Sequence, residues 1–252
     1  MTLPIKGDYD VRYGEGPLQT LDFHPPLIEQ DHTAPLLLFI HGGYWRALDK
    51  SEHVFFAEPY VNSGVAVANV NYDLCPNVTL DEMVEQVIAA LVYCQKHSES
   101  WNVDPNRIFL SGHSAGAHLV VSVLSHPELE GLSLAHAIKG SALLTGIYNP
   151  EIATRVSVNA EIGLSDAMAT QHNCFNKKLV CKAPIISAVG GDEPLGWIDQ
   201  TKSYANFCGT QGVEATAHVI DSANHYTVLE CAADLTNPLC QKILDLIEGN
   251  RD

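Results

Sequence analysis

Residues 107–118 read RIFLSGHSAGAH and join a short apolar run, a glycine-rich turn and the start of an apolar helix. The turn has the pattern G-x-S-x-G, with Ser114 standing between Gly112 and Gly116. Glycines at these two positions let a strand and the following helix pack closely. The turn would expose the Ser114 hydroxyl at the amino end of the helix, where free N–H groups favour developing negative charge. The alternative is a tight turn with no chemical role, but the flanking strand and helix favour Ser114 as a nucleophile.

Further apolar runs alternate with helical patterns on both sides of this turn. Several runs are continuously apolar, which is typical of strands covered on both faces. This alternation predicts the α/β class, with a mostly parallel central sheet, helices on both faces and a single domain over 1–252. The predicted strands are Gln19–Phe23, Pro35–Ile40, Val65–Asn71, Arg107–Ser111, Ile138–Leu144, Pro184–Val189 and Ala215–Ile220.

The clearest helical pattern begins at Thr79, because Glu82 follows three residues later and completes a capping-box pattern. A second helix is expected over 115–123 and a third over 232–248, with a kink or break at Pro238. The stretch from about 148 to 182 is longer than an ordinary connection. We expect it to form a small helical cap over the carboxyl ends of the strands, where sheets of this kind bind ligands.

A nucleophilic serine needs a base, and the base needs a group that orients it. In folds with this strand–turn–helix motif, the acid and then the histidine follow the serine along the chain. Asp192 follows the predicted strand 184–189 and is our candidate acid. Glu193 and Asp221 compete with it: Glu193 would point to the opposite side if the strand geometry continued, and Asp221 comes early in the next loop.

The sequence has 12 histidines, so position decides which of them is the candidate base. His225 lies in the polar loop that follows the strand 215–220 and precedes the last helical pattern. His113 lies inside the turn and is expected to pack beneath it, and His118 is expected to belong to the fold. The predicted triad is therefore Ser114, Asp192 and His225.

Residues 40–47 read IHGGYWRA and follow a buried strand. In an α/β-hydrolase, N–H groups from the loop at this point complete the oxyanion hole together with the N–H of the residue after the nucleophile. We therefore expect the oxyanion hole at Gly43, Tyr44 and Ala115. Tyr44 and Trp45 are the candidates for contacting substrate, with burial in the core as the alternative for either of them.

HGGYW at 41–45 and GHSAGAHL at 112–119 together resemble the kynurenine formamidase branch of the α/β-hydrolases, relatives of the hormone-sensitive-lipase-like esterases. The resemblance implies an α/β-hydrolase fold, a Ser-Asp-His triad and oxyanion donors at the positions given above. Where the family often has a Ser-Pro pair after the cap helix, this chain reads AMATQHNCFNKK. Asn159 and polar residues near Gln171 are candidates for contacting the amino-acid end of a substrate.

The resemblance also implies a function, an arylformamidase that hydrolyses N-formyl-L-kynurenine to L-kynurenine and formate in tryptophan catabolism. A general carboxylesterase for short acyl esters would use the same residues. A ligand-binding α/β-hydrolase without catalysis is a third alternative, which is disfavoured because every triad candidate is present.

The composition of the chain excludes some classes of binding partner. Thirty acidic against fourteen basic residues give a formal charge of −16, which argues against nucleic acid or an anionic membrane. The seven cysteines lack metal-finger spacing and no H-E-x-x-H pattern occurs, so we expect no metal and no cofactor. The opening residues show no signal-peptide pattern and no apolar run could span a bilayer, so we expect a cytoplasmic protein with reduced thiols and a small-molecule substrate. The oligomeric state stays open, with a homodimer among the options.

Overall fold

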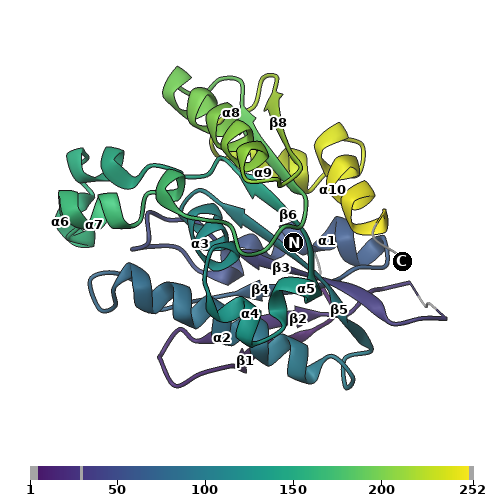
Figure 1. Ribbon diagram of the computed structural model, residues 1–252. Coiled ribbons are helices and arrows are strands. Elements are labelled where there is room, and N and C mark those ends of the chain that lie inside the picture. Colours follow the sequence, from purple (N-terminus) through teal and green to yellow (C-terminus); the bar gives the residue numbers. More distant parts are fainter. Residues whose placement is uncertain (1–4, 29–30, 250–252) are drawn as a thin grey trace.

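The computed structural model describes residues 5–28 and 31–249 and is built around an 8-stranded sheet (Figure 1). The strand order is β1-β2-β4-β3-β5-β6-β7-β8. The strands from β4 to β8 in this order are parallel, and β2 and β1 extend one edge in antiparallel pairing. This confirms the predicted α/β class and the mostly parallel sheet. The strands are β1 (Asp8–Arg12), β2 (Thr20–His24), β3 (Ala34–Ile40), β4 (Ala66–Val70), β5 (Val103–His113), β6 (Ile138–Leu144), β7 (Ile185–Gly190) and β8 (Ala215–Ile220).

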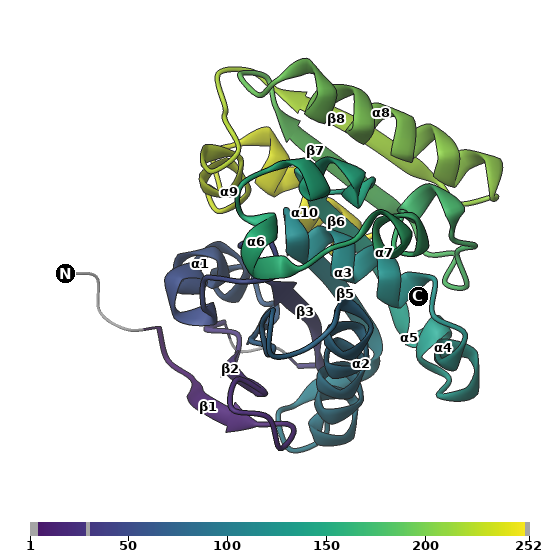
Figure 2. The same ribbon diagram turned by 90° about the vertical axis from the view of Figure 1, so that its left-hand side faces the viewer.

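Helices cover both faces of the sheet. Figure 2 shows α1 and α9 on one side of the strands and α2 and α3 on the other. The predicted single domain spans 1–252, and its ends, residues 1–4 and 250–252, lie outside the described part. Residues 1–4 also belong to the stretch from which we predicted that the chain has no signal peptide. The helices are α1 (Val54–Asn62), α2 (Leu80–His97), α3 (Ala115–Leu124), α4 (Glu128–Gly131), α5 (Leu134–Ala137), α6 (Asn159–Ile162), α7 (Asp166–Gln171), α8 (Leu195–Thr210), α9 (Thr227–Ala232) and α10 (Pro238–Glu248), with 3-10 turns η1 (Lys50–His53), η2 (Pro150–Arg155) and η3 (Cys174–Asn176).

The side chains of β3 alternate between two hydrophobic cores. Leu36, Leu38 and Ile40 pack in the core that includes residues of α2, α3 and α8. Leu37 and Phe39 pack in the core formed with α1, α9 and α10. Successive strand residues point to opposite faces, so a strand buried on both faces must be apolar throughout, as β3 is.

The capping box at the start of α2 is present. The Thr79 side chain accepts from the Glu82 N–H at 3.3 Å, and the Glu82 carboxylate accepts from the Thr79 N–H at 2.7 Å. An N-cap side chain of this kind stabilises a helix by about 1 kcal/mol. The buried side chains of Met83, Val87 and Leu91 then follow at helical spacing and fix the face that α2 turns to the sheet.

Two parts of the fold differ from the sequence prediction. The edge strand β1 was not predicted, because most of its residues are exposed and no apolar pattern marks it. The predicted C-terminal helix over 232–248 is two helices, α9 and α10. Of the kink or break predicted at Pro238, the structure has a break: α9 ends at Ala232 and α10 begins at Pro238, where Asn237 caps the helix and the missing proline N–H is no loss.

The cap consists of η2, α6, α7 and η3 and is therefore made of short elements, as predicted. Figure 2 shows α6 and α7 at the front of the molecule, ahead of the strands. Arg46, in the loop that follows the carboxyl end of β3, forms an ion pair with Glu161 of α6 at 2.9 Å. The cap therefore lies at the carboxyl ends of the strands, the end at which the candidate site is expected.

All seven cysteines are free, and all of them except Cys231 are buried. Burial raises the pKa of Cys75 and of Cys240 to about 11, so both thiols stay protonated at neutral pH. In residues 5–28 and 31–249, no helix has both the length and the apolar character to cross a membrane.

Candidate active site

Ser114 lies in a strained turn between β5 and α3. Its backbone has φ 54° and ψ −116°, a combination that residues with a side chain rarely adopt. Neighbouring glycines make the turn possible: a Cβ on Gly112 would lie 2.6 Å from the carbonyl carbon of Gly116, and one on Gly116 would lie 2.5 Å from the carbonyl oxygen of His41. Ser114 is therefore the N-cap residue of α3, and the N–H of Ala115 is the first of the helix.

The acid that meets His225 is Glu193 and not Asp192. Oε2 of Glu193 lies 2.8 Å from Nδ1 of His225. Oε1 of the same carboxylate accepts from the Thr145 hydroxyl and from the Gly190 N–H, both at 2.9 Å. Both carboxylate oxygens are thus occupied, and the Glu193 side chain is only 2% exposed.

Asp192 is exposed, and its main-chain N–H donates to the carbonyl of Ala223 at 2.9 Å. The prediction for Asp192 is corrected here, and its physical reason is local. The prediction assumed that strand alternation continued through these residues, but β7 ends at Gly190. The Glu193 N–H then approaches the Gly190 carbonyl at 3.3 Å, closing a turn that brings Glu193 to the inside.

His225 receives a second support from inside the serine turn. Nε2 of His113 lies 2.7 Å from the carbonyl oxygen of His225, and the two rings are 4.9 Å apart. Burial lowers the pKa of His113 to about 3, with the nearby His225 as the next cause, so His113 is neutral at pH 7. Because a carbonyl only accepts, His113 must donate from Nε2. His113, which directly precedes Ser114, thus links the serine turn to the loop that carries His225.

The loop after β3 approaches Ser114 with its main chain. A Cβ on Gly42 would lie 3.2 Å from Cβ of Ser114. Gly43, Tyr44 and Trp45 follow with φ of 106°, 49° and 58°. In the described structure, the N–H groups of Gly43 and Tyr44 donate to no protein acceptor, which leaves them available to an oxyanion. The loop that carries the predicted oxyanion residues Gly43 and Tyr44 thus lies against the serine turn at Gly42, and Ala115 directly follows Ser114.

A pocket of about 390 Å³ opens beside His225. Its aromatic lining comes from Tyr44, Trp197 and Tyr226, and the Trp197 ring meets the His225 ring edge-on at 4.8 Å. Sequence reasoning missed Trp197 and Tyr226, although each lies within four residues of a triad candidate, which is the signal that could have found them. The full lining is Tyr44, Asp192, Glu193, Pro194, Trp197, Asn224, His225 and Tyr226.

Trp45 does not line this pocket. Its side chain is 0% exposed and packs edge-on against the His118 ring at 5.1 Å. The prediction of substrate contact therefore fits Tyr44 but not Trp45. The left-handed conformation of both residues turns one ring to the pocket and the other into the core.

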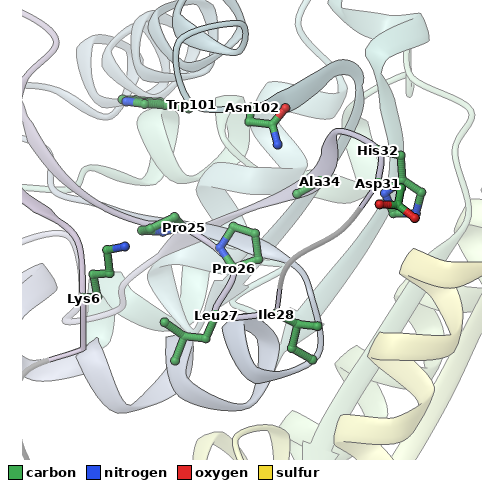
Figure 3. Close-up of a pocket in the computed structure, with 10 residues that line it drawn as sticks. All are labelled: Lys6, Pro25, Pro26, Leu27, Ile28, Asp31, His32, Ala34, Trp101 and Asn102. Carbon is green, nitrogen blue, oxygen red and sulfur yellow. The ribbon is translucent and has the colours of Figure 1, made fainter.

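A larger hollow of about 490 Å³ lies elsewhere on the molecule (Figure 3). It borders Ala34, the first residue of β3, and hence the opposite end of the strand from Ser114. The side chains of Lys6 and of Asp31 and His32 lie on opposite sides of it and do not converge.

Comparisons with known proteins identify the relatives of this chain. A family model described as BD-FAE matches residues 21–139. The kynurenine formamidase of Salmo salar is 30% identical over 94% of this chain and 81% of its own length. The kynurenine formamidase of Drosophila melanogaster is 28% identical over 87% of this chain and 75% of its own.

The chain belongs to the kynurenine formamidase family.

Solved structures support the hydrolase fold of this family member. A structure described as a putative thioesterase from Silicibacter sp. TM1040 is 27% identical, covers 94% of this chain and 85% of its own, and superposes with a TM-score of 0.82. An inhibited form of esterase B from Lactobacillus rhamnosis superposes with a TM-score of 0.80 over 98% of this chain and 87% of its own; at 19% identity it shows the fold alone. The protein is therefore a hydrolase with the α/β-hydrolase fold.

In the cap of this kynurenine formamidase family member, the two residues predicted to contact the substrate, Asn159 and Gln171, form hydrogen bonds within the protein. The side chain of Asn159 donates to the Leu164 carbonyl and accepts from the Leu164 N–H, both at 2.9 Å. Gln171 donates to Asp81 of α2 at 3.1 Å. Neither Asn159 nor Gln171 lines the pocket, so neither is placed to contact the amino-acid end of a substrate.

Two further histidines near the serine turn, His41 and His118, are buried and neutral at pH 7. Burial lowers the pKa of His41 to about 4 and that of His118 to about 3. Within the described residues, no three His, Cys, Asp or Glu side chains are grouped so that they could hold a metal ion. Of the triad candidates, the structure joins His225 to Glu193, and His113 links the loop of His225 to the turn that carries Ser114.

Proposed function

We propose that this protein is a serine hydrolase for aryl formamides and that it cleaves N-formyl-L-kynurenine to L-kynurenine and formate. One observation carries the proposal: the Glu193–His225 pair, tied through His113 to the turn of Ser114, borders a pocket with an aromatic lining. Membership of the kynurenine formamidase family supports the formamide as substrate.

In the first half of the reaction, Oγ of Ser114 attacks the formyl carbon and Nε2 of His225 takes the hydroxyl proton. Glu193 holds the hydrogen of the imidazole on Nδ1, which keeps Nε2 free to accept, and stabilises the imidazolium that forms. The carbonyl oxygen becomes an oxyanion facing the N–H groups of Gly43, Tyr44 and Ala115. Each such donor contributes about 2.7–4 kcal/mol to transition-state stabilisation.

The tetrahedral intermediate then loses the aryl amine, which takes the proton from His225 as the C–N bond breaks. A formyl ester remains on Ser114. Water attacks this ester while His225 accepts a proton, and the second intermediate collapses to formate and free serine. Each cycle consumes one water and releases one aryl amine and one formate.

Aromatic side chains support an aryl leaving group. Trp197 and Tyr44 are half-buried and can pack against a ring, while Tyr226 is 71% exposed at the entrance. Ring pairs in edge-on or offset geometry contribute about 0.5–1.5 kcal/mol beyond the area that they bury.

A carboxylesterase for short acyl esters is the second candidate. Apolar surface beside the pocket favours it: Pro194 lines the pocket, and Leu195, the next residue and the first of α8, is 75% exposed. Hydrolysis of an ester would form the same kind of oxyanion intermediate. The shape and lining of the pocket would then decide whether the enzyme prefers esters or formamides.

Two measurements test the proposal. kcat/KM should be higher for N-formylkynurenine than for a short nitrophenyl ester, and a serine-directed phosphonate should add once, at Ser114, as located by mass spectrometry. Ester turnover without formamide turnover would replace the first candidate by the second. An adduct on another serine, or no turnover of either substrate, would overturn the serine hydrolase itself.

A further inference from the structure

Asp192 brings a carboxylate to the pocket that the triad does not use. It lines the pocket and is exposed, because Glu193 takes the position against His225. In the described part of the structure, its only hydrogen bond is made by the main chain, from the Asp192 N–H to Ala223. The carboxylate is therefore available to a ligand.

Asn224 brings a donor beside this carboxylate. The bond from Asp192 to Ala223 places the two residues next to each other on the pocket wall. Oδ1 of Asn224 accepts from the N–H groups of Tyr226 at 2.9 Å and Thr227 at 3.0 Å, which fixes the orientation of the amide. Its Nδ2 group has no acceptor among the described residues and can donate to a ligand.

The pocket lining has no lysine or arginine. Of its two carboxylates, that of Glu193 is paired with His225, so Asp192 carries the charge that a ligand would meet. The aromatic faces of Trp197 and Tyr226 also attract a cation, since the face of an aromatic ring is electron-rich.

We propose that Asp192 and Asn224 receive an amino-acid side arm of the substrate, with Asp192 binding its ammonium group and Asn224 donating to its carboxylate. This inference rests on the proposed function and adds to it the two residues that distinguish aryl substrates by the charge of their side arm. Neutral aryl compounds bind without this contact, and compounds with a lone carboxylate arm are repelled by Asp192.

The test uses three aryl formamides with the same ring and with an arm that ends in ammonium, in carboxylate or in a neutral group. Wild type should prefer the ammonium arm over the neutral one in kcat/KM. Asp192→Asn should lower this ratio about three- to fivefold, the range of an exposed ion pair, and Asp192→Lys should reverse the preference. Raising the salt from 20 to 500 mM should weaken the wild-type preference, because salt screens exposed charges.

Matched variants separate a contact from a change in overall charge. Asp221→Asn removes the same charge from an exposed residue that does not line the pocket, and it should leave the ratio unchanged. Asn224→Asp keeps the Oδ1 acceptor but replaces the donor by an anion. It should lower kcat/KM for the carboxylate arm and raise it for the ammonium arm.

Failure of this inference differs from failure of the proposed function. If wild type hydrolyses esters but no formamide, the same arms are placed on aryl esters, and the effect of Asp192→Asn on the charge ratio decides the inference alone. An unchanged ratio in Asp192→Asn, or an equal change in Asp221→Asn, overturns it with either set of substrates.

Discussion

Oε2 of Glu193 lies 2.8 Å from Nδ1 of His225, and Oε1 is held by donors from Thr145 and Gly190. This arrangement dictates how an amide would sit in place of the carboxylate. In Glu193→Gln, the oxygen must stay against the two donors, so the NH₂ group faces Nδ1 of His225. The imidazole would then carry its hydrogen on Nε2 and could not accept the proton of Ser114.

We therefore expect Glu193→Gln to fold normally and to lose kcat by about 10⁴-fold, as a wrong tautomer does in a well-characterised triad. Steady-state kinetics and a melting curve on the same preparation check this. Asp192→Asn should lose less than tenfold on a neutral aryl substrate. Losses in the opposite order would restore Asp192 as the orienting acid.

His113→Leu should lower kcat about 10- to 100-fold with a smaller effect on KM, since the His225 carbonyl loses its donor and the loop its position. His113→Gln keeps an N–H donor and should recover most of the activity. Because His113 acts on His225, the pH profile of kcat should also shift in His113→Leu. Equal damage in both variants, with an unchanged profile, would leave His113 a packing role alone.

Gly43→Val should lower kcat by about 10²–10³-fold and change KM little, because the oxyanion exists only beyond the ground state. A Cβ at Gly43 would approach the carbonyl carbon of Ala47 to 2.7 Å at φ 106°, so the donor geometry cannot persist. Gly212→Val is the matched control: it has φ 73° and open space around it, and should cost stability without loss of kcat. A rise in KM at constant kcat would remove residue 43 from the oxyanion hole.

Trp197→Ala should penalise an aryl formamide more than a short aliphatic ester, because only an aryl group meets the lost ring. Trp45→Ala should reduce both activities alike and lower the melting temperature, since emptying a core site of this size costs about 3–5 kcal/mol. Both substrates and both melting curves are measured side by side. Substrate discrimination lost in Trp45→Ala but kept in Trp197→Ala would contradict this assignment.

The free energy of unfolding should fall as the pH drops below 6.5. Burial lowers the pKa of His41 to about 4 and the pKa values of His113 and His118 to about 3. Between these values and 6.5, the unfolded chain binds protons that the folded chain does not. Stability is therefore complete above pH 6.5 and is lost on acidification, by up to about 1.4 kcal/mol per pH unit for each histidine.

Urea unfolding at pH 7.5, 6.5 and 5.5 measures this slope. His118→Gln removes one titrating group and keeps a side-chain donor for the His172 carbonyl, so its slope should be shallower than that of wild type. Identical slopes would show that His118 takes up its proton in the folded state.

Local patterns in the sequence predicted most of the fold. Buried strands such as β3 are continuous apolar runs, and the turn at Ser114 is marked by a short local pattern, G-x-S-x-G. The edge strand β1 left no such pattern because its side chains face solvent. The choice between Asp192 and Glu193 depended on where β7 ends, to within one residue. The place of Trp197 in the pocket and that of Trp45 in the core depend on contacts between distant segments, which periodicity does not encode.

The alternation of β3 between two cores restricts how its segment can change in length. Deleting one residue within 34–40 would exchange the faces of every side chain beyond the deletion and draw Gly43 away from the serine turn. Insertions and deletions should therefore be tolerated on the amino side of Ala34, in the loop that leads into the strand. In evolution and in protein engineering, the opposite end of β3, which leads into Gly42 and Gly43, is closed to any change of length.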